Sequence, residues 1–205
     1  MISKWSHEWA GELLLAYETQ LIGRFASPKP IEDAAILRYF CHKCPNGNYL
    51  EIGVLWGGSL IIAGLSMEGE IWGIDPLEGW YGNGAFDPYV KTKVPPSESV
   101  VRRNLREFGV KATLFLHEHP PYPQEIEDLP IDVAFIDGNH SSQAALIDWD
   151  AVKDRTRRYV IFHDLHQKGP PEAFGKASAD PNWKTVWNGL DKDYSRMGVL
   201  ERISS

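Results

Sequence analysis

The chain has 205 residues, of which 43% are hydrophobic and 24% charged, so it can bury the core of one domain. Its net charge of −7, without a long run of Lys and Arg, argues against an extended surface for nucleic acid. No apolar run approaches the roughly 20 residues of a membrane span, and Met1–Trp5 lacks a signal-peptide core. We therefore expect a single cytoplasmic domain, residues 1–205, that binds neither membranes nor nucleic acid.

Two helices are expected before the first strand, within residues 1–46. Trp5 and Trp9 lead an apolar pattern at helical spacing, and a second such pattern covers residues 31–40. The tryptophan-rich helix can pack on its own sheet or on a second copy of the chain, so a homo-oligomer is an open alternative.

The only cysteines, Cys41 and Cys44, form the sequence Cys-His-Lys-Cys. A second pair that would complete a four-cysteine zinc site is lacking, and two cysteines do not make a secreted disulfide framework. A redox pair is one interpretation. We favour ordinary thiols, because both residues fall at the end of a predicted helix.

The next segment predicts a ligand site. A strand over 48–53 ends in an acid and glycines, and a second strand over 70–75 ends in Asp75. Gly53 and Gly57 leave the backbone free to turn sharply and to approach a ligand, because a Cβ would block positive φ angles or close approach. Asp75 is placed to accept hydrogen bonds from the ribose hydroxyls of an adenosine group.

The glycine spacing differs from that of a dinucleotide site. Three residues separate Gly53 from Gly57, whereas the G-x-G-x-x-G pattern has one between its first two glycines. Ser59 falls in the first turn of a helix predicted over 58–67. We predict a nucleotide-like cofactor, which need not carry a pyrophosphate; the alternative is an ordinary strand-to-helix turn.

Strands and helices alternate through the rest of the chain. Strands are predicted near 112–116, 131–137 and 158–163, helices near 97–108, 140–154 and 182–190, and a terminal hairpin within 194–203. This alternation predicts a parallel sheet that is covered by helices on both faces.

Two insertions interrupt the alternation. Residues 77–96 are rich in glycine and aromatic side chains and predict a lid whose Trp80, Tyr81 and Phe86 wall an acceptor pocket. Residues 166–180 predict a second loop at the same edge of the sheet. Plain surface loops are the alternative for both.

Polar side chains end the fourth and fifth predicted strands. Asp137 and Asp164 should lie close together, because neighbouring parallel strands end at one edge, and a divalent cation would relieve their repulsion. Capping of loops or helices is the alternative. Five histidines fall in loops at this edge: His117, His119, His140, His163 and His166.

These motifs together resemble a known family. The resemblance rests on Glu51–Ser59, Asp75–Trp80, Phe135–Ser141 and Phe162–Asp164. They are similar to class I S-adenosylmethionine-dependent methyltransferases, in particular to metal-dependent sugar O-methyltransferases of the macrocin and mycinamicin type and to cephalosporin-hydroxylase-like proteins. The resemblance implies an α/β, Rossmann-like, doubly wound sheet of seven mostly parallel strands with a C-terminal antiparallel hairpin.

The resemblance also implies roles for individual residues. In such enzymes the acid that corresponds to Asp137 and the acidic pair after the next strand are metal ligands. The His three residues after the first acid is their general base. The implied metal ligands are Asp137, His163 and Asp164, and the implied base is His140. The implied cofactor residues are Glu51, Gly53, Gly57, Ser59 and Asp75. We also expect His117 or Glu118 to border the adenine, and His166 to join Trp80, Tyr81 and Phe86 in the acceptor pocket.

One departure concerns the metal. The macrolide enzymes carry Glu-Asp where this chain has His163-Asp164, and imidazole is a poorer ligand for Mg²⁺ than for Mn²⁺. We expect Mg²⁺, with Mn²⁺ as an alternative, and S-adenosylmethionine as the cofactor of O-methyl transfer to a small molecule or sugar. The alternatives are an oxygen-dependent, hydroxylase-like metal oxidoreductase and a non-catalytic protein that binds S-adenosylmethionine.

Overall fold

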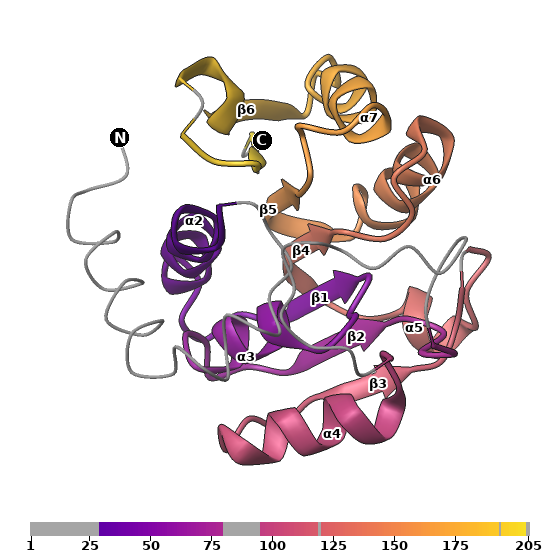
Figure 1. Ribbon diagram of the computed structural model, residues 1–205. Coiled ribbons are helices and arrows are strands. Elements are labelled where there is room, and N and C mark those ends of the chain that lie inside the picture. The colour runs from indigo at the N-terminus through magenta and orange to yellow at the C-terminus, as the bar shows by residue number, and fades with distance from the viewer. Residues whose placement is uncertain (1–28, 80–94, 119, 193, 204–205) are drawn as a thin grey trace.

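The computed structural model describes residues 29–79, 95–118, 120–192 and 194–203. The strands are β1 (Tyr49–Ile52), β2 (Ile71–Ile74), β3 (Thr113–Phe115), β4 (Ile131–Ile136), β5 (Thr156–Phe162), β6 (Trp183–Asn188) and β7 (Gly198–Arg202). The helices are α2 (Pro30–His42), α3 (Gly58–Gly64), α4 (Glu98–Glu107), α5 (Gln124–Glu127), α6 (Ser142–Val152), α7 (Gly169–Ala177) and the 3-10 helix η1 (Gly189–Lys192). Figure 1 shows how they are arranged around one sheet.

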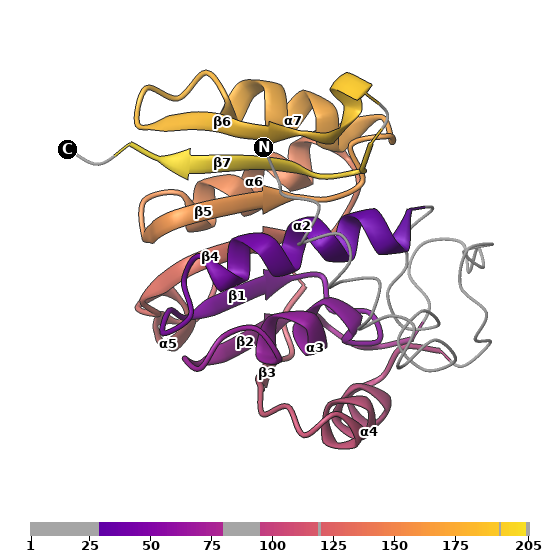
Figure 2. The ribbon, with the colours of Figure 1, turned by 90° about the vertical axis from the view of Figure 1, so that its left-hand side faces the viewer.

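The sheet has seven strands in the order β3-β2-β1-β4-β5-β7-β6 (Figure 2). The five strands from β3 to β5 are parallel, and β7 pairs antiparallel with both β5 and β6. The chain runs outward from β1 through β2 to β3 and then returns to β4, so the strand order reverses between β1 and β4. Ligands of open α/β sheets bind outside the carboxyl ends of the strands at such a reversal.

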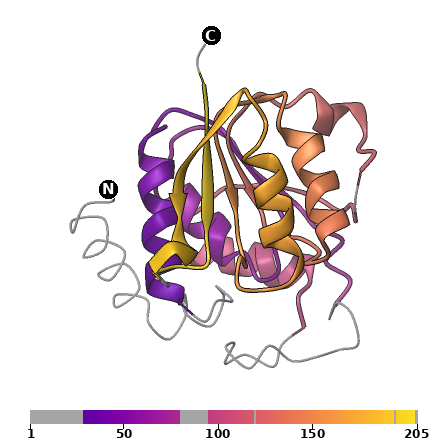
Figure 3. The same ribbon diagram turned by 90° about the horizontal axis from the view of Figure 1, so that it is seen from above.

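Helices cover both faces of the sheet. Figure 3 shows α2 and α3 on one face and α6 and α7 on the other. Two buried apolar clusters match these layers, one formed with α2, α3 and α4 and one with α5, α6 and α7. All four residues of β1 and of β2 are buried, as expected for central parallel strands. The fold class expected from the sequence is therefore confirmed.

The predicted helix over 182–190 is wrong. Residues 183–188 form β6, and the true terminal hairpin joins β6 to β7, whereas we expected a hairpin within 194–203. Trp183 is buried and packs its ring 5.3 Å from that of Trp149, while the three residues that follow it are exposed. The aromatic and β-branched residues of this segment favour an edge strand, which pairs with β7.

The predicted loop over 166–180 also needs correction, because it contains α7. Pro170 and Pro171 indicated a loop, but they stand in the first turn of the helix. Proline is well tolerated there, since the first backbone N–H groups of a helix have no partner within it. Ala173, Phe174 and Ala177 then bury one face of α7.

The predicted helix over 31–40 is confirmed as α2. The tryptophan-rich helix within 1–28 and the lid residues 80–94, with Trp80, Tyr81 and Phe86, lie outside the described residues. An isolated antiparallel bridge between Glu78 and Ser97 joins the two described ends of the lid segment. Among the helices of the described residues, none combines the length and the apolar character that a membrane span requires.

Candidate functional site at the carboxyl edge of the sheet

The turn after β1 is built on positive φ angles. Gly53 has φ +90° and Gly57 has φ +82°, as the sequence predicted for sharp turning. A Cβ on Gly53 would lie 2.1 Å from the carbonyl oxygen of Asp137. This glycine is therefore needed for close approach to the end of β4, in addition to any approach to a ligand.

Strain is concentrated at this edge. The described residues other than glycine with positive φ are Leu55, Leu77 and Asp164, which follow β1, β2 and β5. Such conformations cost about 1–3 kcal/mol each and persist where the surrounding structure enforces them, often at binding sites.

Asp75 holds the turn in place. Its Oδ2 accepts hydrogen bonds from the backbone N–H groups of Val54, at 2.7 Å, and Leu55, at 3.0 Å. Its Oδ1 accepts one from the N–H of Leu77, at 2.7 Å. The carboxylate thus lies where the sequence placed it, at the end of β2 beside the glycine turn. A ribose hydroxyl would have to share its oxygens with the turn.

Glu51 is a fully buried acid beneath the same turn. The hydroxyl of Tyr49 donates a 2.7 Å hydrogen bond to its Oε2, whereas its Oε1 has no hydrogen-bond partner. Burial raises the pKa of Glu51 well above its ordinary value, and Tyr49 and Ser59 oppose that shift only in part. An orphaned carboxyl oxygen of this kind fits a cationic or hydrogen-bond-donating group of a ligand.

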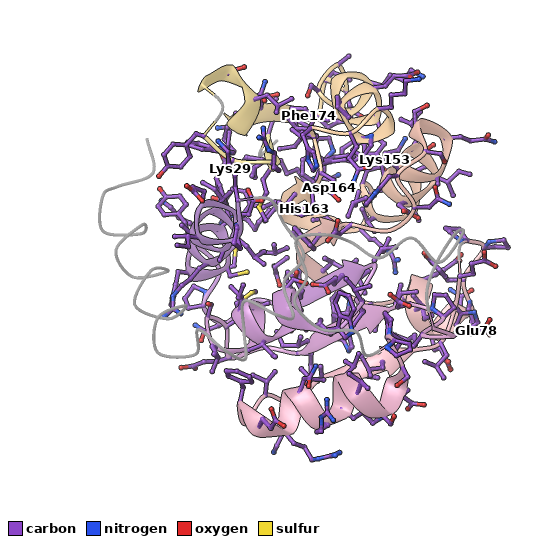
Figure 4. The ribbon with its side chains drawn as sticks, in the orientation of Figure 1. Lys29, Glu78, Lys153, His163, Asp164 and Phe174 are labelled. Atoms are coloured by element: carbon purple, nitrogen blue, oxygen red, sulfur yellow. The ribbon has the colours of Figure 1, made fainter. Side chains whose placement is uncertain are left out.

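Asp137, His163 and Asp164 meet at the ends of β4 and β5. One potential ligand atom from each lies within 4.8 Å of the others. His163 Nδ1 is 2.9 Å from Asp137 Oδ1 and 3.5 Å from Asp164 Oδ1. Figure 4 labels His163 and Asp164 at the end of β5. The structure thus brings together the three residues predicted as metal ligands.

His140 lies beside this cluster. Its Nε2 is 3.0 Å from Asp164 Oδ2 and 3.9 Å from Asp137 Oδ1. Burial opposes the charged form, but the hydrogen bonds with Asp137 and Asp164 outweigh it and raise the pKa of His140 to about 10. Interactions with His163 and His140 outweigh the effect of burial on Asp164 and lower its pKa to about 2. Without a cation, the cluster therefore binds protons at its histidines.

Sequence reasoning missed Asp33 of α2. Its side chain is fully buried, and its Oδ2 lies 3.2 Å from His163 Nε2. Its Oδ1 accepts a 2.7 Å hydrogen bond from the backbone N–H of Arg196. The available signal was an acid on the otherwise apolar face of a helix, since Ala34, Ile36 and Leu37 around it are buried.

The remaining predicted site residues are more dispersed. His117 and Glu118 follow β3, two strands away from β1, and the ring of His117 lies 6.5 Å from that of Tyr122. Ser59 is buried in the first turn of α3. His166 is exposed, with its Nδ1 3.4 Å from Asp164 Oδ1, so it borders the carboxylate cluster.

The donor atoms fit a divalent cation. Neighbouring ligands around a cation with bonds near 2.1 Å are separated by about 3 Å, and the distances of 2.9 and 3.5 Å from His163 Nδ1 agree with this spacing. One imidazole nitrogen and two carboxylates form a mixed set that suits Mn²⁺ better than Mg²⁺.

Comparison with known proteins identifies a family model that matches the chain and solved structures that share its fold. A family model described as a methyltransferase domain matches residues 50–165, more than half of the chain. No curated protein matches the chain.

Several solved structures share the fold over 83–99% of the chain. An O-methyltransferase from Bacillus cereus in complex with SAH is 14% identical, with a TM-score of 0.55 over 98% of this chain and 92% of that one. The O-methyltransferase TomG from Streptomyces achromogenes, involved in tomaymycin synthesis and solved with SAM, is 13% identical, with a TM-score of 0.56 over 99% and 91%. An rRNA methylase from Streptococcus thermophilus is 11% identical, with a TM-score of 0.57 over 83% and 96%.

Proposed function

Because the chain belongs to the methyltransferase-domain family, we propose that it transfers a methyl group from S-adenosylmethionine to a hydroxyl oxygen of a small molecule or sugar, with the help of a divalent cation. The fold is that of the class I S-adenosylmethionine-dependent methyltransferases, as the resemblance implied. Family membership favours methyl transfer over the alternative of an oxygen-dependent oxidoreductase. The O-methyltransferases among its structural neighbours support an oxygen acceptor.

The observation that carries the proposal is the position of the carboxylate and histidine cluster relative to the glycine turn. Gly53 packs directly against the backbone of Asp137, so the turn and the cluster are adjoining parts of one site at the β1/β4 reversal. A methyl donor seated on the turn would face an acceptor held at the cluster. Alignment of two reactants in this way is a large part of the catalysis of group transfer.

The cofactor would rest on residues from three segments. Glu51 would meet the ammonium group at its methionine end, which supplies the partner that Oε1 lacks. Asp75 would take a ribose hydroxyl, while His117 and Glu118 would border the adenine. When bound, S-adenosylmethionine supplies an electrophilic methyl group. Gly57 and Ser59 would complete the turn around it.

The metal would be held by Asp137, His163 and Asp164, as Mg²⁺ or Mn²⁺. When bound, a divalent cation lowers the pKa of a hydroxyl group that it contacts. His140 Nε2 would accept the proton of the acceptor hydroxyl, because this nitrogen faces the cluster. Engagement of Asp137 and Asp164 by a cation would weaken their hold on the His140 proton, so His140 could act as a base near neutral pH.

The acceptor would enter beside His166. Its chemistry would be that of a small hydroxylated molecule, since the net charge of −7 disfavours a nucleic acid substrate. Trp80, Tyr81 and Phe86 would wall this side from the lid segment, whose described ends are joined by the Glu78–Ser97 bridge.

The test is calorimetric titration of S-adenosylmethionine and S-adenosylhomocysteine into protein treated with EDTA, repeated with Mg²⁺ and with Mn²⁺. We expect micromolar binding of both nucleosides and a separate heat for the metal. Glu51→Gln should weaken the binding of both nucleosides, and Asp137→Asn should weaken the binding of the metal. Asp132→Asn is the matched control, because Asp132 stands near the opposite end of β4 and pairs with Arg157.

Two results would overturn the proposal. Failure of S-adenosylmethionine to bind under every condition would remove methyl transfer. Binding of S-adenosylmethionine without binding of either metal would remove metal assistance and leave a metal-independent methyltransferase.

A further inference from the structure

His163 is held from both sides of its ring. The ring is fully buried and lies 5.8 Å from that of Phe135. Nδ1 faces the Asp137 and Asp164 carboxylates, and Nε2 faces Asp33. The first two carboxylates follow β4 and β5, whereas Asp33 comes from α2, 130 residues earlier in the chain.

The carboxylate of Asp33 keeps a proton on Nε2. A carboxylate beside a ring nitrogen stabilises it by accepting a hydrogen bond, so Nε2–H donates to Asp33 Oδ2 and, without a cation, Nδ1–H donates to Asp137 Oδ1 at 2.9 Å. A cation that takes the place of the Nδ1 proton would leave His163 neutral, with the lone pair of Nδ1 directed toward the cation and Nε2–H still on Asp33. This is the tautomer that a metal ligand at Nδ1 requires.

Asp33 is itself held in place. The backbone N–H of Arg196, in the segment before β7, donates to its other oxygen at 2.7 Å. The carboxylate therefore joins α2, the end of β5 and the segment before β7. Because both oxygens are engaged in different directions, rotation of the carboxylate would break one contact or the other.

We propose that Asp33 is a positioning residue that sets the tautomer and the ring orientation of His163, so that Nδ1 serves as the third ligand of the cation. The inference rests on the proposed metal-assisted function. It assigns to α2 a part in the site. A carboxylate behind a ligating histidine is a common means of orienting the ring and raising its basicity.

The first test uses metal alone, with no S-adenosylmethionine. Mn²⁺ is titrated into the full-length protein after EDTA treatment, for wild type, Asp33→Asn and Glu32→Gln. Asparagine is close in shape, but its single carbonyl oxygen cannot accept from both His163 and Arg196. Glu32→Gln removes the same charge from the adjacent position of α2. We expect Asp33→Asn to weaken Mn²⁺ binding about 10–100-fold. Glu32→Gln should change the Mn²⁺ affinity less than about twofold.

A second readout separates positioning from general loosening of the fold. The affinity for S-adenosylmethionine should stay within about twofold in Asp33→Asn, because the variant leaves the glycine turn untouched. Equal losses of metal and cofactor affinity would overturn the inference and indicate a purely structural role. Unchanged Mn²⁺ affinity in Asp33→Asn would also overturn it.

The third measurement uses only the wild-type protein, so it does not depend on whether a variant folds. Long-range ¹H–¹⁵N spectra of the wild-type protein without metal report which ring nitrogen of His163 is protonated. A proton on Nε2 supports the inference, and a bare Nε2 overturns it. If wild-type protein binds no metal while Nε2 is protonated, the metal-assisted function fails but the orientation of His163 by Asp33 stands, so the two failures are distinguishable.

Discussion

Gly53 and Asp137 touch backbone to backbone, so closely that a single added methyl group on Gly53 would lie 2.1 Å from the Asp137 carbonyl oxygen. This contact joins the cofactor turn after β1 to the strand end that carries a proposed metal ligand. The same residue also needs its positive φ of +90°. Both requirements favour glycine at this position over any residue that carries a Cβ.

Gly53→Ala should therefore destabilise the protein by roughly 3 kcal/mol, from the cost of positive φ together with overpacking. Gly109 is the matched control, because it has φ +67° and a Cβ added there would meet no atom within 4 Å. Gly109→Ala should cost only about 1 kcal/mol. Urea unfolding of both variants measures the difference, and equal losses would show that the Asp137 contact is relieved by small backbone shifts.

Gly175→Ala should stabilise the protein. Gly175 is exposed within α7, and a Cβ there would meet no atom within 4 Å. Alanine in a helix is favoured over glycine by about 0.5–1 kcal/mol. Thermal unfolding should show a higher midpoint for Gly175→Ala and a lower one for Gly169→Ala, whose Cβ would lie 2.2 Å from the carbonyl oxygen of His140. A lower midpoint for Gly175→Ala would contradict the prediction.

Asp75→Ala should have two separable effects. It leaves the N–H groups of Val54, Leu55 and Leu77 without their acceptor, so the protein should lose roughly 2–4 kcal/mol of stability. It should also remove recognition of the ribose. Calorimetric titration compares the affinity of S-adenosylhomocysteine with that of its 2′-deoxy and 3′-deoxy analogues, for wild type and for Asp75→Ala.

Wild type should bind at least one deoxy analogue about tenfold more weakly than the parent compound, as expected for one lost hydrogen bond to a charged group. Asp75→Ala should bind all three compounds alike. Discrimination that survives in Asp75→Ala would place the ribose elsewhere, whatever the variant does to stability.

Both cysteines should react slowly with alkylating agents. Burial raises the pKa of Cys44 to about 11, with Asp132 and Glu201 adding to the effect against Arg158. Burial, Cys44 and Glu51 raise the pKa of Cys41 well above its ordinary value. At pH 8 roughly one Cys44 thiol in a thousand is then ionised. Mass spectrometry after iodoacetamide treatment should show little modification of the native protein and complete modification in guanidinium. Rapid native labelling would instead favour the redox-pair interpretation.

His140 should titrate near pH 10 in protein kept free of metal by EDTA. Its ion pairs stabilise the folded state fully below the unfolded pKa of about 6.5, and this contribution is lost as the pH rises toward 10. An NMR titration of the ring measures the midpoint, with His140→Gln for assignment. A midpoint near 6.5 would contradict the prediction.

Much of the site was determined by the sequence itself. Asp75 and Asp137 come directly after the apolar strands β2 and β4, and Asp164 follows the end of β5 after one intervening residue. Parallel strands end at one edge of a sheet. Their convergence therefore followed from the alternation of strands and helices alone. Glycines at 53 and 57 likewise predicted the sharp turn, because the backbone preference of glycine is a local property.

Other features were decided only by the tertiary structure. β6 was mistaken for a helix because an edge strand is stabilised by pairing with β7 and by burial of Trp183, neither of which local periodicity reveals. Asp33 lies 130 residues from His163 in the chain, and no local pattern connects them. Their contact exists because the first turn of α2 lies against the end of β5. A buried acid has a favourable partner only where packing places one, and that placement is a property of the whole fold.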